Sequence, residues 1–200
     1  MIAIVDYGMG NLASVQKALK QLGLDSLITN DHRSIEEASS ILLPGVGSFH
    51  QGMKNLENLG LPELLKQQVL IHKKPFLGIC LGMQLIMENG TEPEICSGLG
   101  WIKGWVKPIE NKKLPIPHLG WNRVYDPKIN DQKDTIENNF YFIHSYHVVP
   151  EEDVKLTYVN YEYPLVASIE KGHIFATQFH PEKSQESGLE LMKAFYQKYA

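Results

Sequence analysis

Apolar residues in the first part of the chain follow two alternating patterns, which predict strands and helices in turn. Residues 1–7 form an apolar run interrupted by Asp6, as expected of a buried strand. From residue 12 to residue 22, apolar side chains recur at every third or fourth position until Gly23, which predicts an amphipathic helix. These residues therefore form a first strand-helix unit.

The same order of elements continues toward the middle of the chain. Residues 26–30 and residues 39–45 predict two more short strands. Ser34 with Glu37 predicts a capped helix between them. This alternation is typical of an α/β fold, with a mostly parallel central sheet flanked by helices.

The next strand and helix meet at Cys80. A helix is predicted to begin near Pro62, and the apolar residues 75–79 predict a buried strand after it. Residues 81–89 have the pattern of a helix that ends at Gly90. Cys80 therefore lies at a corner between a strand and a helix.

From residue 101 onward, short β segments predict a β-rich extension with mixed or antiparallel pairing. Ser187 and Glu190 predict the capped start of a closing helix with an apolar stripe. No repeat, low-complexity tract or linker divides the chain, so residues 1–200 are predicted to form one domain. The predicted strands of the extension are residues 101–109, 139–150, 155–161, 165–171 and 173–180.

The composition is that of an ordinary globular enzyme. Apolar residues make up 43% of the chain and charged residues 21%, and the formal net charge is -4 with the lysines and arginines scattered. A nucleic-acid partner is therefore not expected. No apolar run reaches the roughly 18 residues of a membrane span, so we expect a cytoplasmic protein that does not enter a membrane.

Cys80 has the sequence surroundings of a nucleophile. Gly78 and Gly82 stand two positions on either side of it, and small residues there allow the sharp strand-to-helix turn of a nucleophile elbow. A helix N-terminus also favours the thiolate form of cysteine, which is the reactive form. A buried structural cysteine is the alternative for Cys80, whereas Cys96 is expected to be a small packed residue in a loop.

The segment His180-Pro181-Glu182 offers the other groups that a cysteine nucleophile needs. An imidazole can take the thiol proton and return it to a leaving amine, and a nearby carboxylate can orient the imidazole. By itself the tripeptide is equally compatible with a surface turn. Together with the elbow it predicts a triad of Cys80, His180 and Glu182.

Glycines after the third predicted strand leave backbone N-H groups uncovered. In Pro44-Gly45-Val46-Gly47 these groups suit an oxyanion hole, with the N-H of Leu81 as a second donor. The same residues are compatible with a tight turn in which glycine adopts positive φ. Their place at the carboxyl edge of a parallel sheet favours the functional role, because ligands bind there in open α/β folds.

The histidines do not predict a metal site. His118, His144 and His147 lie in aromatic β segments, where hydrogen-bonded structural histidines are expected. The two cysteines lack the spacing of zinc ligands. No metal and no cofactor are predicted.

Three motifs, in this order and spacing, resemble those of the class I glutamine amidotransferases over almost the whole chain: PGVGSF, GICLGMQ and QFHPEKS. The resemblance implies that Cys80 attacks the carboxamide of glutamine and releases ammonia, and that His180 then activates water to release glutamate. The further residues implied to hold the glutamine or to stabilise the oxyanion are Gln84, Ser145, Tyr146, Gly47 and Leu81.

Other segments resemble a subgroup of this family that passes its ammonia to a separate (β/α)8-barrel cyclase subunit. These segments are DYGMGNL at the start of the chain, PHLGWN at residues 117–122, and YFIHSYHV. The resemblance implies a heterodimer in which the cyclase closes an imidazole ring in histidine biosynthesis. The residues implied at or near the cyclase-facing side are Asn11, His118, Trp121, Asn122 and Lys183.

Four alternatives remain open. The PHLGWN segment argues against the related glutaminase subunit of pyridoxal phosphate synthase, whereas a paralogue that amidates surface sugars with its own barrel would keep these motifs. A non-catalytic binding protein on the same fold would be expected to have lost a triad residue. A cysteine hydrolase acting on peptides would share the triad, and a comparison of glutamine with peptide substrates would separate the two.

Overall fold

The computed structural model describes residues 1–110, 113–128 and 138–199. A nine-stranded sheet forms its centre, in the order β2-β1-β3-β4-β13-β12-β11-β8-β9. The first five strands pair in parallel, and the other four continue the sheet in antiparallel order. The predicted α/β fold with a β-rich extension is confirmed. The strands are β1 (Ile2–Val5), β2 (Ser26–Thr29), β3 (Ser40–Gly45), β4 (Phe76–Cys80), β8 (His118–Tyr125), β9 (Asn139–His144), β11 (Lys155–Tyr161), β12 (Tyr163–Lys171) and β13 (Ile174–Thr177).

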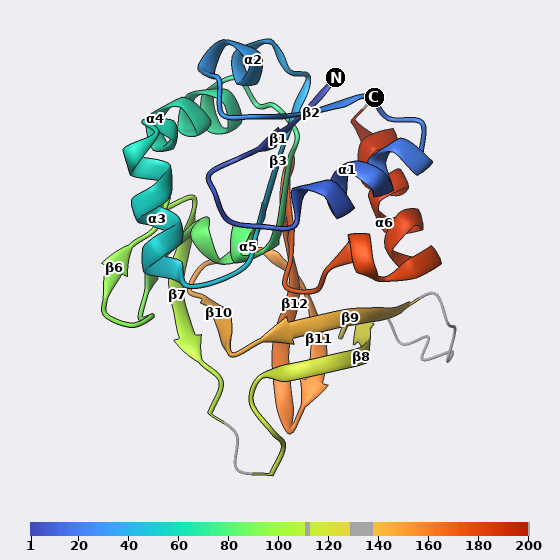
Figure 1. Cartoon of the computed structure of the whole chain (residues 1–200). Helices are drawn as coiled ribbons and strands as arrows, with labels where there is room; N and C mark the ends of the chain where they lie inside the picture. Colours follow the sequence, from blue (N-terminus) through green and yellow to red (C-terminus); the bar gives the residue numbers. More distant parts are fainter. Residues whose placement is uncertain (111–112, 129–137, 200) are drawn as a thin grey trace.

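Helices cover both faces of the parallel strands (Figure 1). On one face, Val15 and Met192 pack with Ile4, whereas on the other face Ile35 and Phe49 belong to the cluster that contains Ala3. Strands buried on both faces must be apolar at successive positions, which explains the continuous apolar runs of the sequence. The helices are α1 (Leu12–Gln21) and α6 (Gln185–Lys198) on the first face, and α2 (His32–Glu37), α3 (Phe49–Asn58), α4 (Leu61–Lys66) and α5 (Leu81–Leu85) on the second.

A second, four-stranded sheet has the order β10-β7-β5-β6. Its strand β5 (Met87–Gly90) occupies residues that were predicted to continue a helix, so the predicted helix at residues 81–89 is wrong beyond α5. Met87 pairs with Ile102, and both side chains are buried in the core. Pairing between distant segments decides the conformation here over the local helical pattern. The other strands of this sheet are β6 (Cys96–Ser97), β7 (Ile102–Pro108) and β10 (Tyr146–Pro150).

Both predicted capping boxes are wrong, because each helix begins earlier than expected. The Asp31 side chain caps α2 by accepting a hydrogen bond from the Ser34 N-H at 2.8 Å. Helix α6 begins at Gln185, so Ser187 lies inside its first turn. Pro62 lies in the first turn of α4 as predicted, and a π-helical turn, Gln67–Ile71, extends that helix.

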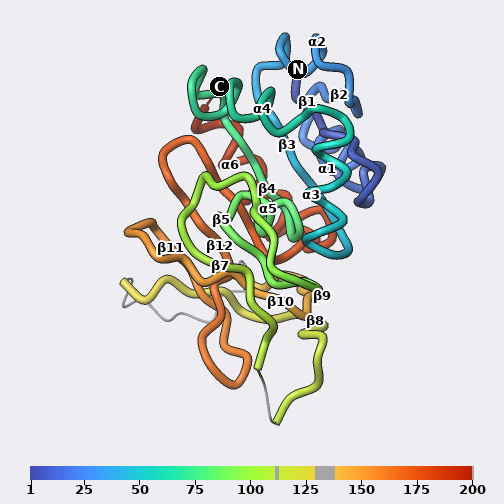
Figure 2. Tube along the Cα trace, turned by 90° about the vertical axis from the view of Figure 1, so that its left-hand side faces the viewer, coloured from blue at the N-terminus to red at the C-terminus, as the bar shows by residue number. Residues whose placement is uncertain are grey.

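The β-rich extension faces the carboxyl ends of the parallel strands. In the turned view of Figure 2, β8, β9 and β10 lie on the side of the molecule away from the two chain ends. The segment between β9 and β10 thereby comes to lie over the end of β4, where a cavity separates the two parts. None of the helices in the described part of the chain has the length and apolar character needed to cross a membrane.

Candidate active site

Three neighbouring parallel strands end at the same edge of the sheet, and each carries one part of the candidate site. Gly45 at the end of β3 pairs with Cys80 at the end of β4. Strand β13 lies on the other side of β4, and His180 follows shortly after its last residue. Parallel pairing therefore brings together three segments that are far apart in the sequence.

Cys80 adopts a backbone conformation that is rare for any residue other than glycine, with φ 54° and ψ -106°. The turn places α5 so close to β3 that a Cβ at Gly82 would overlap the carbonyl oxygen of Leu43. A Cβ at Gly78 would lie 3.0 Å from the carbonyl oxygen of residue 82, which is also too close. The predicted nucleophile elbow is present, and strain of this kind gathers at functional sites.

His180 and Glu182 form a buried pair beside Cys80. The His180 Nδ1 lies 2.7 Å from Glu182 Oε1, and the two side chains are 3% and 2% exposed. Because a carboxylate only accepts, Nδ1 carries the hydrogen and Nε2 is the atom that can exchange a proton with the thiol.

Charge at the site favours an ion pair between sulfur and imidazole. Burial lowers the pKa of His180, but Cys80 and Glu182, through hydrogen bonding and charge, raise it more, so that the pKa lies above its ordinary value. A protonated imidazole beside a thiolate is the resting form of many cysteine nucleophiles. The sequence suggested that a helix dipole favours the thiolate. Helix α5 has only five residues, so its dipole is short and His180 is the main group that favours the thiolate here.

The backbone of His180, which follows β13 in the chain, is hydrogen-bonded to β9. Its N-H donates to the Tyr141 carbonyl at 2.9 Å. The buried Ser184 hydroxyl donates to the His180 carbonyl at 2.6 Å and accepts from the Tyr141 N-H at 2.9 Å. Sequence reasoning missed Ser184, for which the QFHPEKS motif was the only signal.

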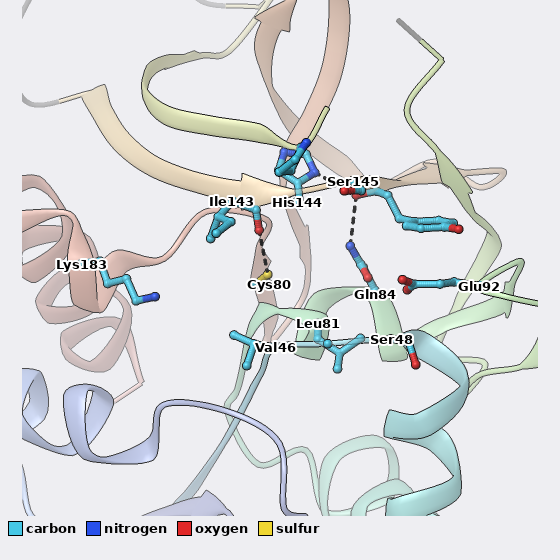
Figure 3. Close-up of a pocket in the computed structure, with 13 residues that line it drawn as sticks. Val46, Ser48, Cys80, Leu81, Gln84, Glu92, Ile143, His144, Ser145 and Lys183 are labelled. Carbon is cyan, nitrogen blue, oxygen red and sulfur yellow. Dashed lines mark hydrogen bonds between the residues drawn. The ribbon is translucent and has the colours of Figure 1, made fainter. Parts of the chain in front are cut away.

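A cavity of about 400 Å³ opens over Cys80 (Figure 3). Gly47 and Leu81, the predicted oxyanion donors, line one wall, and Gly47 has the positive φ of 110° that favours glycine. The predicted substrate residues Ser145 and Tyr146 line the opposite wall. The Ile143 carbonyl on that wall lies 4.0 Å from the Cys80 sulfur.

Two buried carboxamides connect this wall with the nucleophile. The Nε2 of Gln84 donates to the Tyr146 carbonyl and to Gln178 Oε1, both at 3.1 Å. The Nε2 of Gln178 donates in turn to the Cys80 sulfur at 3.7 Å. Gln84 was predicted at the site, whereas Gln178 was missed although it belongs to the QFHPEKS motif.

A match to a protein-family model identifies the family of this chain. The family model described as "Glutamine amidotransferase class-I" matches residues 3–198. The chain belongs to the class I glutamine amidotransferase family. A glutamine-hydrolysing enzyme with a cysteine nucleophile fits the geometry around Cys80.

Named members of this family align over almost their whole length. "Imidazole glycerol phosphate synthase subunit HisH 1" of Campylobacter jejuni (strain RM1221) is 49% identical over 198 residues, which cover 98% of each chain. "Imidazole glycerol phosphate synthase subunit HisH" of Aquifex aeolicus (strain VF5) is 46% identical over 201 residues, which cover 98% of this chain and 95% of that one.

Solved structures show the same fold at lower sequence identity. One described as "Crystal structure of glutamine amidotransferase" has a TM-score of 0.75 at 17% identity and covers 100% of this chain and 99% of that chain. "Structure of PurLQS from Thermotoga maritima" has a TM-score of 0.73 at 17% identity and covers 100% of this chain and 98% of that chain.

Glu92 lines the cavity of this amidotransferase but was not predicted from the sequence. One carboxylate oxygen accepts from the Phe49 N-H at 3.1 Å. Burial raises the pKa of Glu92, and this hydrogen bond opposes the rise. Figure 3 shows Glu92 and Lys183 on opposite sides of Cys80. Glu92 lies in a loop that belongs to no motif, so nothing in the sequence marked it.

The residues implied at the cyclase-facing side fall into two groups: three are at least partly exposed, and two lie on the inner face of β8. Trp121 is 47% exposed on β8, Lys183 lines the cavity, and the exposed Asn11 caps α1 by accepting from the Ser14 N-H. His118 is fully buried, so direct contact with a partner is excluded for this side chain as it lies here. Asn122 is half-buried and hydrogen-bonds His118 on the inner face of β8.

His118 and His144 form a buried pair behind the cavity. Nδ1 of His118 lies 2.9 Å from Nε2 of His144, and the His118 ring is stacked with Phe142 and Tyr161. Burial lowers the pKa of His118 to about 4 and that of His144 to about 3. Both imidazoles are therefore neutral at pH 7, and the expected hydrogen bonds of these two histidines are present.

This neutral pair predicts that acid destabilises the fold. Unfolded histidines take up protons near their ordinary pKa of 6.5, whereas the folded pair has pKa values of about 4 and about 3. Between the folded and the unfolded pKa of each histidine, the unfolded state binds more protons than the folded state. The free energy of unfolding therefore decreases as pH falls below 6.5. We expect a loss of up to about 1.4 kcal/mol per pH unit for each histidine, measured by urea unfolding between about pH 7 and about pH 5.

His118→Asn should flatten this pH dependence, because it removes one of the two buried neutral imidazoles. His180 adds little slope below about pH 6, because its raised pKa leaves it protonated in the folded state and an ordinary pKa leaves it protonated in the unfolded state. Equal slopes in wild type and His118→Asn would contradict the neutral buried form of His118.

Proposed function

We propose that this chain is the glutaminase subunit of an imidazole glycerol phosphate synthase, with Cys80, His180 and Glu182 as its catalytic triad. The observation that carries the proposal is the strained Cys80 turn beside a buried His180-Glu182 pair at 2.7 Å. The names of the full-length relatives support the choice of synthase. All three triad residues are present, which argues against a non-catalytic relative.

The first half of the proposed reaction forms a thioester. The Cys80 thiolate attacks the carboxamide carbon of glutamine, and the oxyanion that develops receives hydrogen bonds from backbone N-H groups at Leu81 and around Gly47. The carbon-nitrogen bond then breaks while His180 gives its Nε2 proton to the leaving nitrogen, which departs as ammonia. The products of this half are a glutamyl thioester and ammonia.

The second half releases glutamate. His180, now neutral, takes a proton from a water molecule that attacks the thioester carbon, and the carbon-sulfur bond breaks to restore the Cys80 thiolate. Glu182 keeps the hydrogen on Nδ1 throughout, so that Nε2 remains the atom that exchanges protons.

The shape and charge of the cavity favour glutamine over a peptide. Glu92 offers a carboxylate on one side of Cys80, which suits the α-ammonium group of a free amino acid. The nitrogen at the same place in a peptide carries no charge. We propose that Gln84 and the backbone at Ser145 and Tyr146 hold the rest of the substrate.

The outer face of β8 and β9 supports a protein partner beside the cavity. Leu119 pairs with Ile143 and Trp121 pairs with Tyr141, so these side chains share one face. Leu119 is 57% exposed and Ile143 is 40% exposed, and the Lys183 Nζ lies 5.9 Å from the Tyr141 ring centre. Exposed aromatic and aliphatic residues gathered on one face are typical of interfaces. We propose a heterodimer in the cytoplasm, in which a (β/α)8-barrel cyclase covers this face and receives the ammonia.

Trp121→Ala should weaken binding of the cyclase about 30-fold, because a central exposed tryptophan often contributes about 2 kcal/mol to an interface. Ile71→Ala is the matched control, since Ile71 is 61% exposed in the π-helical turn outside the proposed interface. Calorimetric titration of the purified subunits gives both dissociation constants. Equal affinities of the two variants would place the interface elsewhere.

Growth of a histidine auxotroph tests the choice of synthase. In a strain without its own glutaminase subunit, this chain together with its cognate cyclase should restore growth without histidine, and the Cys80→Ala variant should not do so at low ammonium. If the purified complex released glutamate but growth were not restored, the paralogue that amidates surface sugars would be the better assignment.

A further inference from the structure

The carbonyl oxygen of Tyr146 is the meeting point of two chains of hydrogen bonds. His144 Nδ1 lies 2.8 Å from it on one side, and Gln84 Nε2 lies 3.1 Å from it on the other. A carbonyl oxygen can only accept, so both nitrogens must carry the hydrogen. This one atom therefore fixes the direction of every hydrogen bond in both chains.

The outer chain runs from Tyr146 to the strand β8. With hydrogen on Nδ1, neutral His144 presents a lone pair at Nε2, and His118 must donate to it from its own Nδ1 at 2.9 Å. The lone pair at His118 Nε2 is then free to accept from Asn122 Nδ2 at 2.7 Å. Each of these three hydrogen bonds therefore joins a donor to an acceptor.

The inner chain runs from Tyr146 to the nucleophile. Because the Gln84 nitrogen faces the carbonyl, it presents its second hydrogen to Gln178, whose oxygen must therefore face Gln84. The Gln178 nitrogen is then directed at the Cys80 sulfur, where an N-H donor stabilises a thiolate. Gln84 and Gln178 are 4% and 0% exposed, so water cannot easily replace these bonds.

We propose that His118 and His144 are positioning residues of the glutaminase centre, which hold the Tyr146 carbonyl and through it the carboxamides of Gln84 and Gln178 in the orientation that Cys80 requires. This inference rests on the proposed glutaminase function. The two imidazoles are bonded to each other, to Asn122 and to the Tyr146 carbonyl, so they act on Cys80 indirectly, through Tyr146.

The orientation of Gln84 has a direct consequence for substrate binding. Both hydrogens of its nitrogen are used by Tyr146 and Gln178, which leaves Oε1 as the acceptor available to glutamine. Figure 3 shows this oxygen turned away from Ser145, which lies between β9 and β10. A rotated carboxamide would offer a donor in place of this acceptor and would break the bonds of Gln84 to Tyr146 and to Gln178.

A pair of variants at His144 separates positioning from packing. In His144→Asn the side-chain nitrogen can replace Nδ1 as the donor to Tyr146, whereas His144→Leu fills the space without any donor. We expect the leucine variant to lose about tenfold in kcat/KM for glutamine in complex with the cyclase, and the asparagine variant to stay within about threefold of wild type. Rates are expressed per mole of complex isolated by gel filtration, so that misfolded molecules do not count.

Nitrogen NMR of the histidine-labelled chain without its partner gives a second readout that does not depend on activity. His118 and His144 should both show the neutral tautomer with hydrogen on Nδ1, with signals assigned from His118→Asn and His144→Asn. A protonated ring, or hydrogen on Nε2 of either residue at neutral pH, would overturn the inference. Wild-type kinetics in His144→Leu would also overturn it, whereas an inactive wild-type complex would instead contradict the proposed function.

Discussion

Cys80→Ala is expected to reduce glutamine-dependent turnover of the complex by about 10,000-fold or more, because Cys80 supplies the sulfur of the proposed thioester. The same variant should fold normally and bind the cyclase, since the substitution removes one buried sulfur atom and introduces no larger group. Synthesis from added ammonium salts should therefore continue at the wild-type rate.

Cys96→Ala is the matched control for this variant. Cys96 is the other free cysteine of the chain, lies half-buried in β6, and has no part in the proposed reaction. The assay follows formation of the cyclase product from glutamine and, in parallel, from ammonium. Loss of both activities in Cys80→Ala would contradict the division of labour between the two subunits.

Glu182→Gln should lower kcat/KM for glutamine by about 100-fold to 10,000-fold while leaving KM nearly unchanged. A carboxamide nitrogen placed at Oε1 would force His180 Nδ1 to accept, and Nε2 would then hold a hydrogen and be unable to take one from the thiol. With either orientation of the amide, the negative charge that raises the pKa of His180 is gone.

Glu190→Gln provides the control, because Glu190 lies on the exposed side of α6 and its side chain is 67% accessible. The rate of Cys80 alkylation supplies a second measurement of the same effect. It should be lower in Glu182→Gln, because the variant lacks the carboxylate that helps to raise the pKa of the His180 imidazole beside the sulfur. An unchanged kcat/KM would exclude Glu182 as the residue that orients the imidazole.

The strand-helix order of the parallel half could be predicted from the sequence because the signals there are local. Strands buried on both faces are continuous apolar runs, and the glycines around Cys80 mark the elbow within five residues. Parallel pairing then places Gly45, Cys80 and the segment after β13 at one edge by topology alone. The proximity of Cys80 to the segment that carries His180 and Glu182 could be predicted for this reason.

The parts that the sequence did not predict depend on contacts between distant segments. The helix expected over residues 81–89 stops because Met87 pairs with Ile102, and the start of α2 depends on which nearby side chain, Asp31 or Ser34, reaches a free N-H. The local sequence favours neither alternative clearly at these two places, so contacts with other parts of the chain decide which one forms.

The residues around Cys80 and His180 also depend on contacts between distant segments. Gln178 becomes a partner of Cys80 only because β13 lies beside β4, although the two residues are 98 positions apart. His118 and His144 meet across the β8-β9 pair, and Glu92 enters the cavity from a loop. The QFHPEKS motif contains Gln178, but the sequence does not show which residue each of these side chains contacts.

The most direct test of the account is glutamate release from glutamine by the purified chain, measured alone and with the cyclase subunit and its ribonucleotide ligand. The account predicts glutamate release by the wild-type complex and no release by the Cys80→Ala complex. No release by the wild-type chain in either state would contradict it.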